Sequence, residues 1–350
     1  MVLPEEIPSA LDVFRQLLSV ASPSGNEKQM SGIVAGLIDE MGWKAEIDAA
    51  GNVLVRLAGQ DPSLGLCILA AHIDEIGVVV KIIHLDGSLE IENAGGLLPW
   101  KLGERPIEIL GDHETIVGVT GFGAAHGSKM NRLVEWGDVK VITGLTMEQL
   151  KKAGVRPGSC GVPLRSQCGP VLFGNPADPL VAAWTFDDRM GVVALLRLLK
   201  VMKLEGIQPQ HPTIIAFTTQ EELGGQGARI LAHRERCETF ISIDGSPIPP
   251  ESGLSLDGRP AIWSMDRLGQ FDQDLLRFLV NAAVEAGTDL QPVLQLGAAC
   301  DSSMVGATGG AARIADFGHV RENSHGYEVS RLSVFDNVLK ILVQFIKTWK

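Results

Sequence analysis

The sequence predicts an α/β protein whose central mixed sheet carries helices on both faces and is interrupted by an inserted small β-rich domain. Apolar runs that end in polar turns alternate with helical periods in residues 1–77 and again in 176–350. Residues 78–175 hold short apolar runs between glycine-rich turns, the pattern of a small barrel or sandwich. We therefore expect residues 1–77 and 176–350 to form one domain, with 78–175 inserted into it.

Each expected element rests on its own local pattern. The apolar run within 66–77 is continuous rather than alternating, which favours a strand covered on both faces. Residues 27–41 repeat apolar side chains at helical spacing after the break at 22–25. By these criteria we expect helices over 7–20, 27–41, 190–202, 225–232, 270–286 and 329–349, and strands over 44–47, 52–57, 66–77, 213–218, 239–243 and 312–315.

The composition excludes several classes of protein. Hydrophobic residues make up 45 % and charged residues 21 %, and no apolar run approaches the ~20 residues of a membrane helix. The net charge of −12 without a basic cluster argues against a nucleic-acid partner. The five cysteines form no CxxC pair, and no secretion signal precedes the first helix. We expect reduced thiols in a cytoplasmic protein that binds neither membrane nor nucleic acid.

Acids and histidines gather at the expected strand ends. They are His72 with Asp74, Asp187 with Asp188, Glu221 with Glu222, Asp244 in "SIDG", and His325 in a polar loop before the last helix. Ligands bind at the carboxyl ends of strands in open α/β sheets, so these side chains are expected to converge. So many carboxylates repel one another unless cations are present, and among these motifs only Asp-Asp-Arg brings an arginine, Arg189. The mixed set of ligands suits zinc, cobalt or manganese better than calcium.

The spacing within two motifs suggests separate roles for neighbouring groups. Side chains two apart on an extended chain point the same way, so Asp74 can accept a hydrogen bond from the ring of His72 and orient it. Glu221 and Glu222 are adjacent, and neighbours on an extended segment point in different directions. One of them can therefore ligate a metal while the other holds the proton of the attacking water.

Each motif alone has a simpler interpretation. An HxD pair can be a structural hydrogen bond, an Asp-Asp-Arg run can be a helix N-cap, and a Glu-Glu pair can be the solvated first turn of a helix. The combination of four acidic strand ends, each after a buried apolar run, favours a shared site.

Other reactive side chains are expected to be structural. "ACDSS" offers Cys300 or Ser302 as a nucleophile, but no oriented His–acid pair is near, so we expect Cys300 to be a small buried residue and Asp301 to cap a helix. His319 is the alternative to His325, because the two lie in one segment. The remaining histidines are expected to be structural or solvated: His84, His113, His126, His211 and His233.

Four motifs together resemble a known family. "AAHIDEIG", "TFDDRMG", "TTQEELGGQGA" and "SIDG" occur here in the order found in the dinuclear-metal glutamyl and deblocking aminopeptidases of the tetrahedral (TET) type, which include FrvX-like proteins and relatives named endoglucanases. The resemblance extends over essentially the whole chain, including "GGLLPWKLGERPIEIL" and "GVTGFGAAHG". It implies a zinc-exopeptidase-like fold whose PDZ-like insert is a dimerisation domain, in a homo-oligomer between a dimer and a dodecamer.

The resemblance also implies a role for each candidate residue. His72 and Asp244 would ligate one divalent metal, Glu222 and His325 a second, and Asp187 would bridge the pair. The metals would be Zn²⁺ or Co²⁺, with Mn²⁺ as a further option. Glu221 would be the general base, Asp74 would orient His72, and Asp188 and Arg189 would support the site. The implied activity is removal of N-terminal residues from peptides that have a free N-terminus.

The chain departs from the family pattern near its C-terminus. A Pro-x-Arg-Tyr-x-His-Ser-Pro stretch is replaced by "FGHVRENSHGYEVS", whose His-Gly-Tyr-Glu resembles a subgroup of related hydrolases and favours His325 over His319. The family's Gly-Thr-Asp reads Ala299-Cys300-Asp301 here. The alternatives to an aminopeptidase are a small-molecule amidohydrolase or deacylase with the same metals, a metal-free glycosidase with two carboxylates, and an inactive shell subunit.

Overall fold

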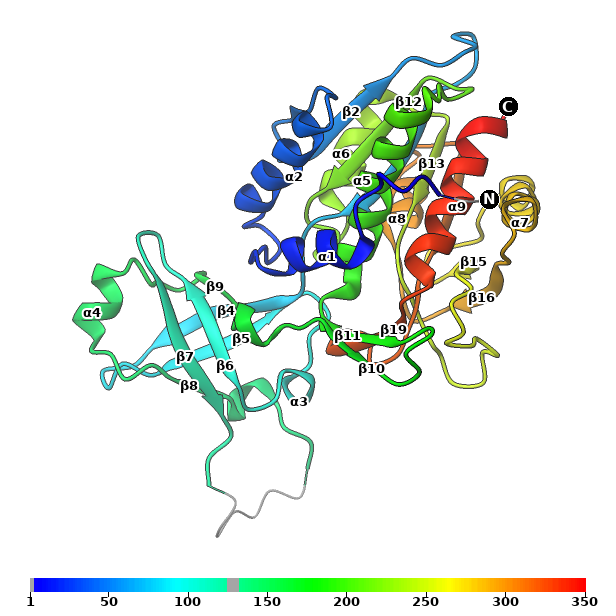
Figure 1. Cartoon of the computed structure of the whole chain (residues 1–350). Helices are drawn as coiled ribbons and strands as arrows, with labels where there is room; N and C mark the ends of the chain where they lie inside the picture. The colour runs from blue at the N-terminus through cyan, green and yellow to red at the C-terminus, as the bar shows by residue number, and fades with distance from the viewer. Residues whose placement is uncertain (1–2, 125–131) are drawn as a thin grey trace.

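The computed structural model describes residues 3–124 and 132–350. Figure 1 shows two lobes, a larger one around an eight-stranded sheet and a smaller closed β-barrel. The chain leaves the larger lobe after β3 (Cys67–His72) and returns to it through β11 (Leu180–Trp184). This arrangement confirms the predicted α/β class with an inserted β-rich unit. Of the two forms expected for the insert, the structure shows the barrel and not the sandwich.

The large sheet is mixed, with parallel strands at its centre. In spatial order its strands are β1 (Glu46–Ile47), β2 (Val53–Leu57), β12 (Thr213–Thr218), β3, β13 (Thr239–Ser242), β17 (Arg313–Gly318), β15 (Ala261–Asp266) and β16 (Gln291–Gln295). β3 lies parallel to both β12 and β13, and β13 parallel to β17. β2 is antiparallel to β12, and β15 is antiparallel to β17. The carboxyl ends of β12, β3 and β13 therefore meet at one edge.

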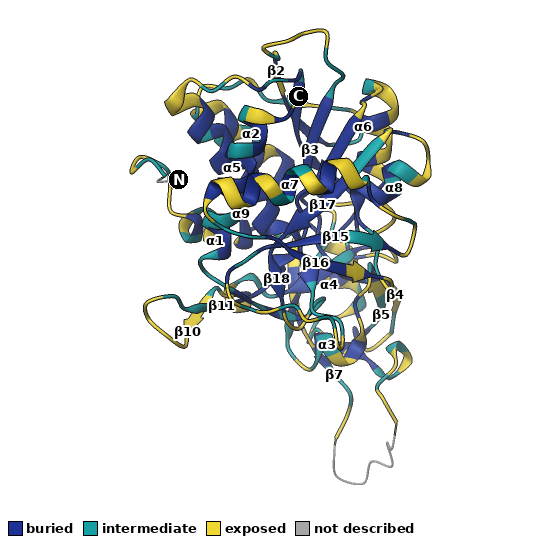
Figure 2. Ribbon diagram, turned by 90° about the vertical axis from the view of Figure 1, so that its right-hand side faces the viewer, coloured by how far each residue is buried: buried dark blue, intermediate teal, exposed yellow. Residues whose placement is uncertain are grey.

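Alternate residues of β3 face two helical layers, as a strand buried on both faces requires. One layer consists of α1 (Ala10–Leu18), α2 (Lys28–Glu40), α5 (Phe186–Glu205), α7 (Gln273–Ala286) and α9 (Val334–Thr348); the other consists of α6 (Gln226–Glu235) and α8 (Asp301–Ala307). Cys67, Leu69 and Ala71 pack in the first core, whereas Ile68 and Ala70 pack in the second. Figure 2 shows the central strands such as β3 in dark blue and the exposed residues on the outer turns of the surface helices.

The first part of helix α5 is buried on every side because it lies between the sheet and two other helices. Residues 186–199 are all buried, and α5 packs against β3, α1 and α9. The helix begins at Phe186, earlier than the predicted 190, but Asp187 and Asp188 have non-helical φ/ψ. This irregular start places the two aspartates at the carboxyl edge of the sheet.

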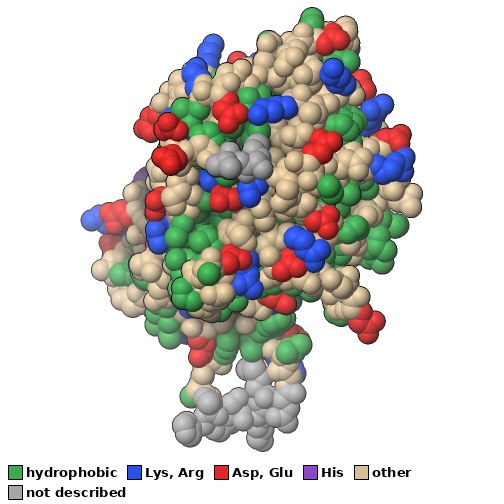
Figure 3. All heavy atoms as spheres, turned by 45° about the vertical axis from the view of Figure 1, so that its right-hand side comes forward, with side chains coloured by type: hydrophobic (Ala, Val, Ile, Leu, Met, Phe, Trp, Pro, Cys, Tyr) green, Lys and Arg blue, Asp and Glu red, His purple; other side chains and the backbone are tan. Residues whose placement is uncertain are grey.

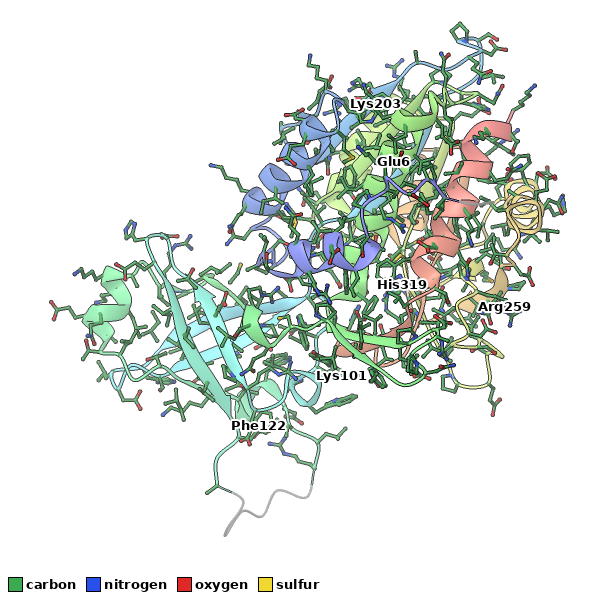
Figure 4. The ribbon with its side chains drawn as sticks, in the orientation of Figure 1. Glu6, Lys101, Phe122, Lys203, Arg259 and His319 are labelled. Carbon is green, nitrogen blue, oxygen red and sulfur yellow. The ribbon has the colours of Figure 1, made fainter. Side chains whose placement is uncertain are left out.

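The smaller lobe is a closed six-stranded barrel with its own core. Its strands are β4 (Gly77–Ile83), β5 (Leu89–Ala94), β8 (Lys140–Ile142), β7 (Thr115–Gly121), β6 (Pro106–Leu110) and β9 (Cys160–Pro163), in spatial order. Short helices α3 (Pro99–Leu102) and α4 (Met147–Lys152) flank it. Along β7 the pattern alternates, with Ile116 buried while Val117 and Val119 are exposed. Figure 4 places Phe122 just after β7 and Lys101 in α3.

A buried ion cluster joins the barrel to the larger lobe. Glu75, at the end of the β3 segment, accepts hydrogen bonds from Arg165 of the barrel region at 3.0 Å and from Arg189 of α5 at 3.3 Å. Arg189 also donates to the carbonyl of Ile73 at 2.6 Å. All three charged side chains are at most 10 % exposed, so the negative charge of Glu75 and the positive charges of the two arginines must compensate one another.

The sequence patterns misplaced several elements. Residues 329–331, predicted as the start of the last helix, belong to β19 (Tyr327–Arg331), because this segment pairs with β11, which in turn pairs with β10 (Val171–Phe173). Helix α9 therefore starts at Val334, and tertiary pairing overrides the local apolar spacing. Elements that we did not predict include β10, β11, β15, β16, α3 and the short pair β14 (Ser246–Pro247) and β18 (Val320–Arg321).

The surface carries both signs of charge without a dominant basic patch on the face seen in Figure 3. None of the described helices is long and apolar enough to cross a membrane. All five cysteines are unpaired, and Cys300 is fully buried, as predicted. His126 lies outside the described residues.

Candidate metal centre

A cavity of about 1080 Å³ opens at the carboxyl edge of the large sheet. Its acidic part is lined by Asp187, Glu221, Glu222 and Asp244, which come from α5 and from the turns after β12 and β13. Its other walls are largely apolar, with prolines 247, 249, 250 and 292 and Trp263 among them. The site thus lies where parallel strands of an α/β sheet end, as expected from strand topology.

His72, the last residue of β3, contacts acids on both sides of its ring. Its Nε2 lies 3.0 Å from Asp187 Oδ1 and 4.0 Å from Glu221 Oε2. Its Nδ1 lies 3.1 Å from the carbonyl oxygen of Asp74 and 3.4 Å from Asp74 Oδ1. Asp74 therefore faces the ring of His72, and the backbone carbonyl is the closer acceptor.

His325 lies on the other side of Asp187. Its Nε2 is 3.4 Å from Asp187 Oδ2 and 3.7 Å from Glu222 Oε2. Asp187 consequently directs one carboxylate oxygen towards His72 and the other towards His325. His319 does not join this cluster; it packs against Phe186 inside the larger lobe (Figure 4), with ring centroids 5.6 Å apart.

Two groups of side chains can each surround one cation. Ligand atoms of His72, Asp187 and Glu222 lie within 4.8 Å of one another, and so do those of His72, Asp188 and Asp244. Asp188, which the sequence argument gave only a supporting role, is thus as close to His72 and Asp244 as a ligand would be. The structure brings together the five expected ligands and adds Asp188 to them.

Asp74 fixes the turn that carries the two glutamates. Its carboxylate accepts hydrogen bonds from the backbone N–H of Glu221 at 2.9 Å, from that of Glu222 at 3.1 Å, and from Ser24 Oγ at 2.6 Å. The glutamates lie in a turn rather than on the extended segment that we expected. They still point to different neighbours, because Glu221 approaches His72 while Glu222 approaches His325.

The buried carboxylates are short of positive charge. Burial and the neighbouring Asp187 raise the pKa of Asp244 to about 7, and burial raises that of Glu222 to about 7 although His325 opposes it. Burial and Asp244 raise the pKa of Asp188 well above its usual range. Asp188 Oδ2 and Glu222 Oε1 also have no hydrogen-bond partner among the described residues. A donor set of this kind fits divalent cations, which would supply the missing charge.

The sequence argument missed an arginine and a glutamate in this site. Arg321, in the segment that also holds His319 and His325, contacts Asp187 Oδ2, and its Nε lies 3.0 Å from Glu328 Oε1. Glu328 accepts hydrogen bonds from the backbone N–H of Asp187 at 3.0 Å and of His325 at 3.1 Å. The sequence feature that could have identified Arg321 is its position four residues before His325, within the "FGHVRENSHGYEVS" stretch that departs from the family pattern.

The barrel region also reaches the site, which the sequence argument did not anticipate. Gly95 and Gly96 follow β5, and Gly96 lines the cavity. A Cβ at Gly96 would collide with the ring of His325, and one at Gly95 would lie 3.1 Å from Glu222 Oε2. The glycine pair in "NAGGLLPW" is therefore the local signal for this close approach.

The segment after Ala299 differs from our expectation in one respect. Cys300, rather than Asp301, is the N-cap residue of α8. Asp301 is the first residue of the helix, and its carboxylate accepts a hydrogen bond from Thr218 at 2.6 Å, below the glutamate turn. Ser302 donates to the carbonyl of Ala315 at 2.6 Å. Among the described residues no histidine forms a hydrogen bond with Cys300 or Ser302, so the nucleophile interpretation has no support here.

The fold and this donor set define the protein as an α/β metallopeptidase. Residues 51–341 match the M42 glutamyl aminopeptidase family. Because this match covers most of the chain, the protein belongs to that family, whose members are enzymes that hydrolyse peptides from the N-terminus.

Relatives in sequence agree with this assignment, and solved structures share the fold. The chain is 24 % identical to the lysyl aminopeptidase of Pyrococcus furiosus over 67 % of its length and 65 % of that protein's length. It is 25 % identical to the glutamyl aminopeptidase of Lactococcus lactis over 67 % and 66 % of the two lengths. Its fold is similar to a TET aminopeptidase from a marine sediment archaeon (TM-score 0.87, 21 % identity, 97 % and 96 % covered). It is also similar to the TET1 peptidase of Pyrococcus horikoshii (TM-score 0.85, 23 % identity, 97 % and 99 % covered).

Proposed function

We propose that this protein is an aminopeptidase that uses two divalent metal ions and takes Glu221 as its general base. The observation that carries the proposal is the convergence of His72, Asp187, Glu222, Asp244 and His325 around one cavity. Several of their buried carboxylates lack the positive charge that their burial demands. Zn²⁺ or Co²⁺, with Mn²⁺ as a third option, suits this mixture of imidazole and carboxylate.

When bound, the metals would polarise the scissile carbonyl and acidify the attacking water. His72 and Asp244 would hold one ion, Glu222 and His325 the other, with Asp187 between them. Asp188 is a further candidate ligand on the His72 side. Asp74 would keep the ring of His72 and the backbone of both glutamates in place.

Glu221 is suited to move the proton. It is buried and lies 4.0 Å from His72, and it belongs to neither group of candidate ligands that the described residues form. Burial, with the nearby Asp244 and Glu222, raises its pKa well above the usual range. A carboxylate with a raised pKa accepts a proton from the attacking water more readily and can then deliver it to the leaving amine.

The substrate class follows from the charge of the cavity. An acidic floor favours the cationic α-amino group of a peptide with a free N-terminus. The apolar walls around Trp263 offer room for a side chain. A deacylase would instead act on N-acylated substrates, so the two activities separate in a substrate screen.

We propose that residues 78–175 form the dimerisation insert of a cytoplasmic homo-oligomer. Val119 of β7 and Ile142 of β8 are register partners, and they are 45 % and 60 % exposed. With Val117 they form an apolar outer face on the barrel, of a kind that subunit contacts cover. The P. horikoshii TET1 peptidase can assemble into a tetrahedron or an octahedral shell, which supports association here as well. Native mass spectrometry of the Val119→Asp variant tests this, because loss of association is expected.

A metal-loaded activity screen tests the enzymatic proposal. Aminoacyl p-nitroanilides should be cleaved by protein loaded with Zn²⁺, Co²⁺ or Mn²⁺, and elemental analysis should give about two ions per chain. Glu221→Gln should retain the metal while turnover falls by ~10²–10⁴-fold. Glu90→Gln, on an exposed pair with His84, is the matched control and should keep full turnover.

Three outcomes would contradict the proposal. Cleavage of N-acyl substrates alone would identify a deacylase, and full activity in a chelator would point to a metal-free hydrolase such as a glycosidase. If the protein bound no metal after loading, it would be identified as an inactive shell subunit.

A further inference from the structure

Arg321 is a permanent positive charge inside the proposed metal centre. It ends β18, its side chain is only 4 % exposed, and it lines the cavity beside Asp187 and Asp244. Its guanidinium contacts Asp187 Oδ2, and Nη1 lies 3.8 Å from Asp244 Oδ1. Because an arginine does not lose its proton in a protein, this charge is present whether or not metals are bound.

The two oxygens of Asp187 are not equivalent. Oδ1 faces His72 at 3.0 Å, whereas Oδ2 faces His325 at 3.4 Å and also receives the guanidinium of Arg321. A cation held by Asp187 Oδ2, Glu222 and His325 would therefore share its oxygen ligand with Arg321. A cation on the His72 side would use Asp187 Oδ1, which Arg321 does not contact, and Asp244, whose Oδ1 lies at the longer distance of 3.8 Å from Nη1.

The guanidinium is held in this position by its surroundings. Glu328 pairs with Nε at 3.0 Å, and Glu328 is itself fixed by the backbone N–H groups of Asp187 and His325. Gly245 leaves the space that Nη1 occupies, since a Cβ at Gly245 would overlap that atom. Nη1 has no hydrogen-bond partner among the described residues, and the carboxylate that it faces is that of Asp244, whose Oδ1 lies 3.8 Å away.

We propose that Arg321 is a counter-cation built into the metal centre, which makes the two cation positions unequal by weakening binding on the His325 side. This inference rests on the proposed function, because it needs a centre with two cations. In the metal-free protein the same charge offsets the repulsion among Asp187, Asp244 and Glu328. The enzyme therefore keeps its ligands assembled while it holds the second cation loosely.

Isothermal titration calorimetry of the metal-free protein with Mn²⁺ at pH 8.5 tests whether Arg321 makes the two sites unequal. Wild type should bind two ions with dissociation constants that differ by at least ~10-fold. Arg321→Met should tighten the weaker site by at least ~10-fold and leave the stronger one within ~3-fold. Arg321→Lys keeps the charge and should preserve the unequal pair. Arg197→Met, which removes a buried arginine of α5 that pairs with Asp336 of α9, should change neither constant.

Arg321→Met leaves Glu328 without its partner and is checked for folding by circular dichroism. The double variant Arg321→Met/Glu328→Gln removes both charges and should tighten the weaker site in the same way. The inference is overturned if these variants bind Mn²⁺ as wild type does or more weakly, or if wild type binds two ions equally. Those results would leave the proposed function intact, whereas a wild type that binds no ion would overturn both.

Discussion

Gly96→Ala tests whether the barrel region helps to hold the metal centre. A Cβ built on Gly96 lies 2.5 Å from Cε1 of His325, whereas ordinary contact begins at 3.4 Å. The ring must therefore move by about 1 Å or the loop must shift by a similar amount. The backbone of Gly96 does not have a positive φ, so alanine meets no left-handed strain there. Among the described residues, the ring of His325 is what the built Cβ meets within 4 Å.

The size of the effect follows from this displacement. A misplacement of ~1 Å can lower the rate of an enzyme by ~10²-fold, and loss of support for a metal ligand typically weakens metal binding by ~10–100-fold. We expect the dissociation constant of the weaker Mn²⁺ site to rise by ~10–100-fold in Gly96→Ala, because His325 is a ligand of that site in the proposed centre. The change should appear in calorimetric titration of the metal-free protein, with little effect on the stronger site.

A matched control and a double-variant cycle decide the cause. Gly36→Ala, in α2, places a Cβ where no atom lies within 4 Å, and it should leave both dissociation constants unchanged. In a His325→Ala background the clash is absent, so Gly96→Ala should have no further effect. Wild-type affinity in Gly96→Ala, or equal weakening in the His325→Ala background, would refute the reasoning.

Three further predictions concern the turn, the pH dependence and the junction between the lobes. Asp74→Asn replaces a carboxylate oxygen that accepts a backbone N–H by an amide that cannot, so kcat should fall by ~10²-fold with the fold retained by circular dichroism. In the metal-free protein the pKa of Glu222 is raised to about 7 and that of His325 to about 10. Protonation of these two groups therefore stabilises the folded state fully at a pH below their pKa values in the unfolded chain. This stabilisation is lost as the pH rises through their pKa values in the folded protein. The rise in Tm that Mn²⁺ gives should therefore grow between pH 6 and pH 10, and a constant increment would contradict these shifts. Glu75→Gln leaves two buried arginines unpaired and should lower the free energy of unfolding by ~3–5 kcal/mol in urea titration, whereas Glu92→Gln on an exposed pair should change it by less than ~1 kcal/mol.

The sequence predicted well those elements whose pattern is local and strong. β12 spans 213–218 as expected, and α2 and α7 differ from expectation only at their ends. The continuous apolar run before His72 predicted a strand buried on both faces, which β3 is. The last three residues of β19, 329–331, were mistaken for helix, because the pairing of this strand with β11 depends on residues about 150 positions away in the chain. Local periodicity carries no information on such a partner.

For the site, the chain by itself determined the kind of chemistry. Histidines and carboxylates directly after buried strands must converge where those strands end, and their mutual repulsion calls for cations. Only the tertiary structure decided which groups join them. Arg321, Glu328 and Gly96 reach the site from β18, β19 and the barrel region, through packing that no spacing in the sequence expresses. The physical reason is that the pleat of a strand sets the direction of the side chains at its end. Contacts between distant segments are set only when the whole core has packed.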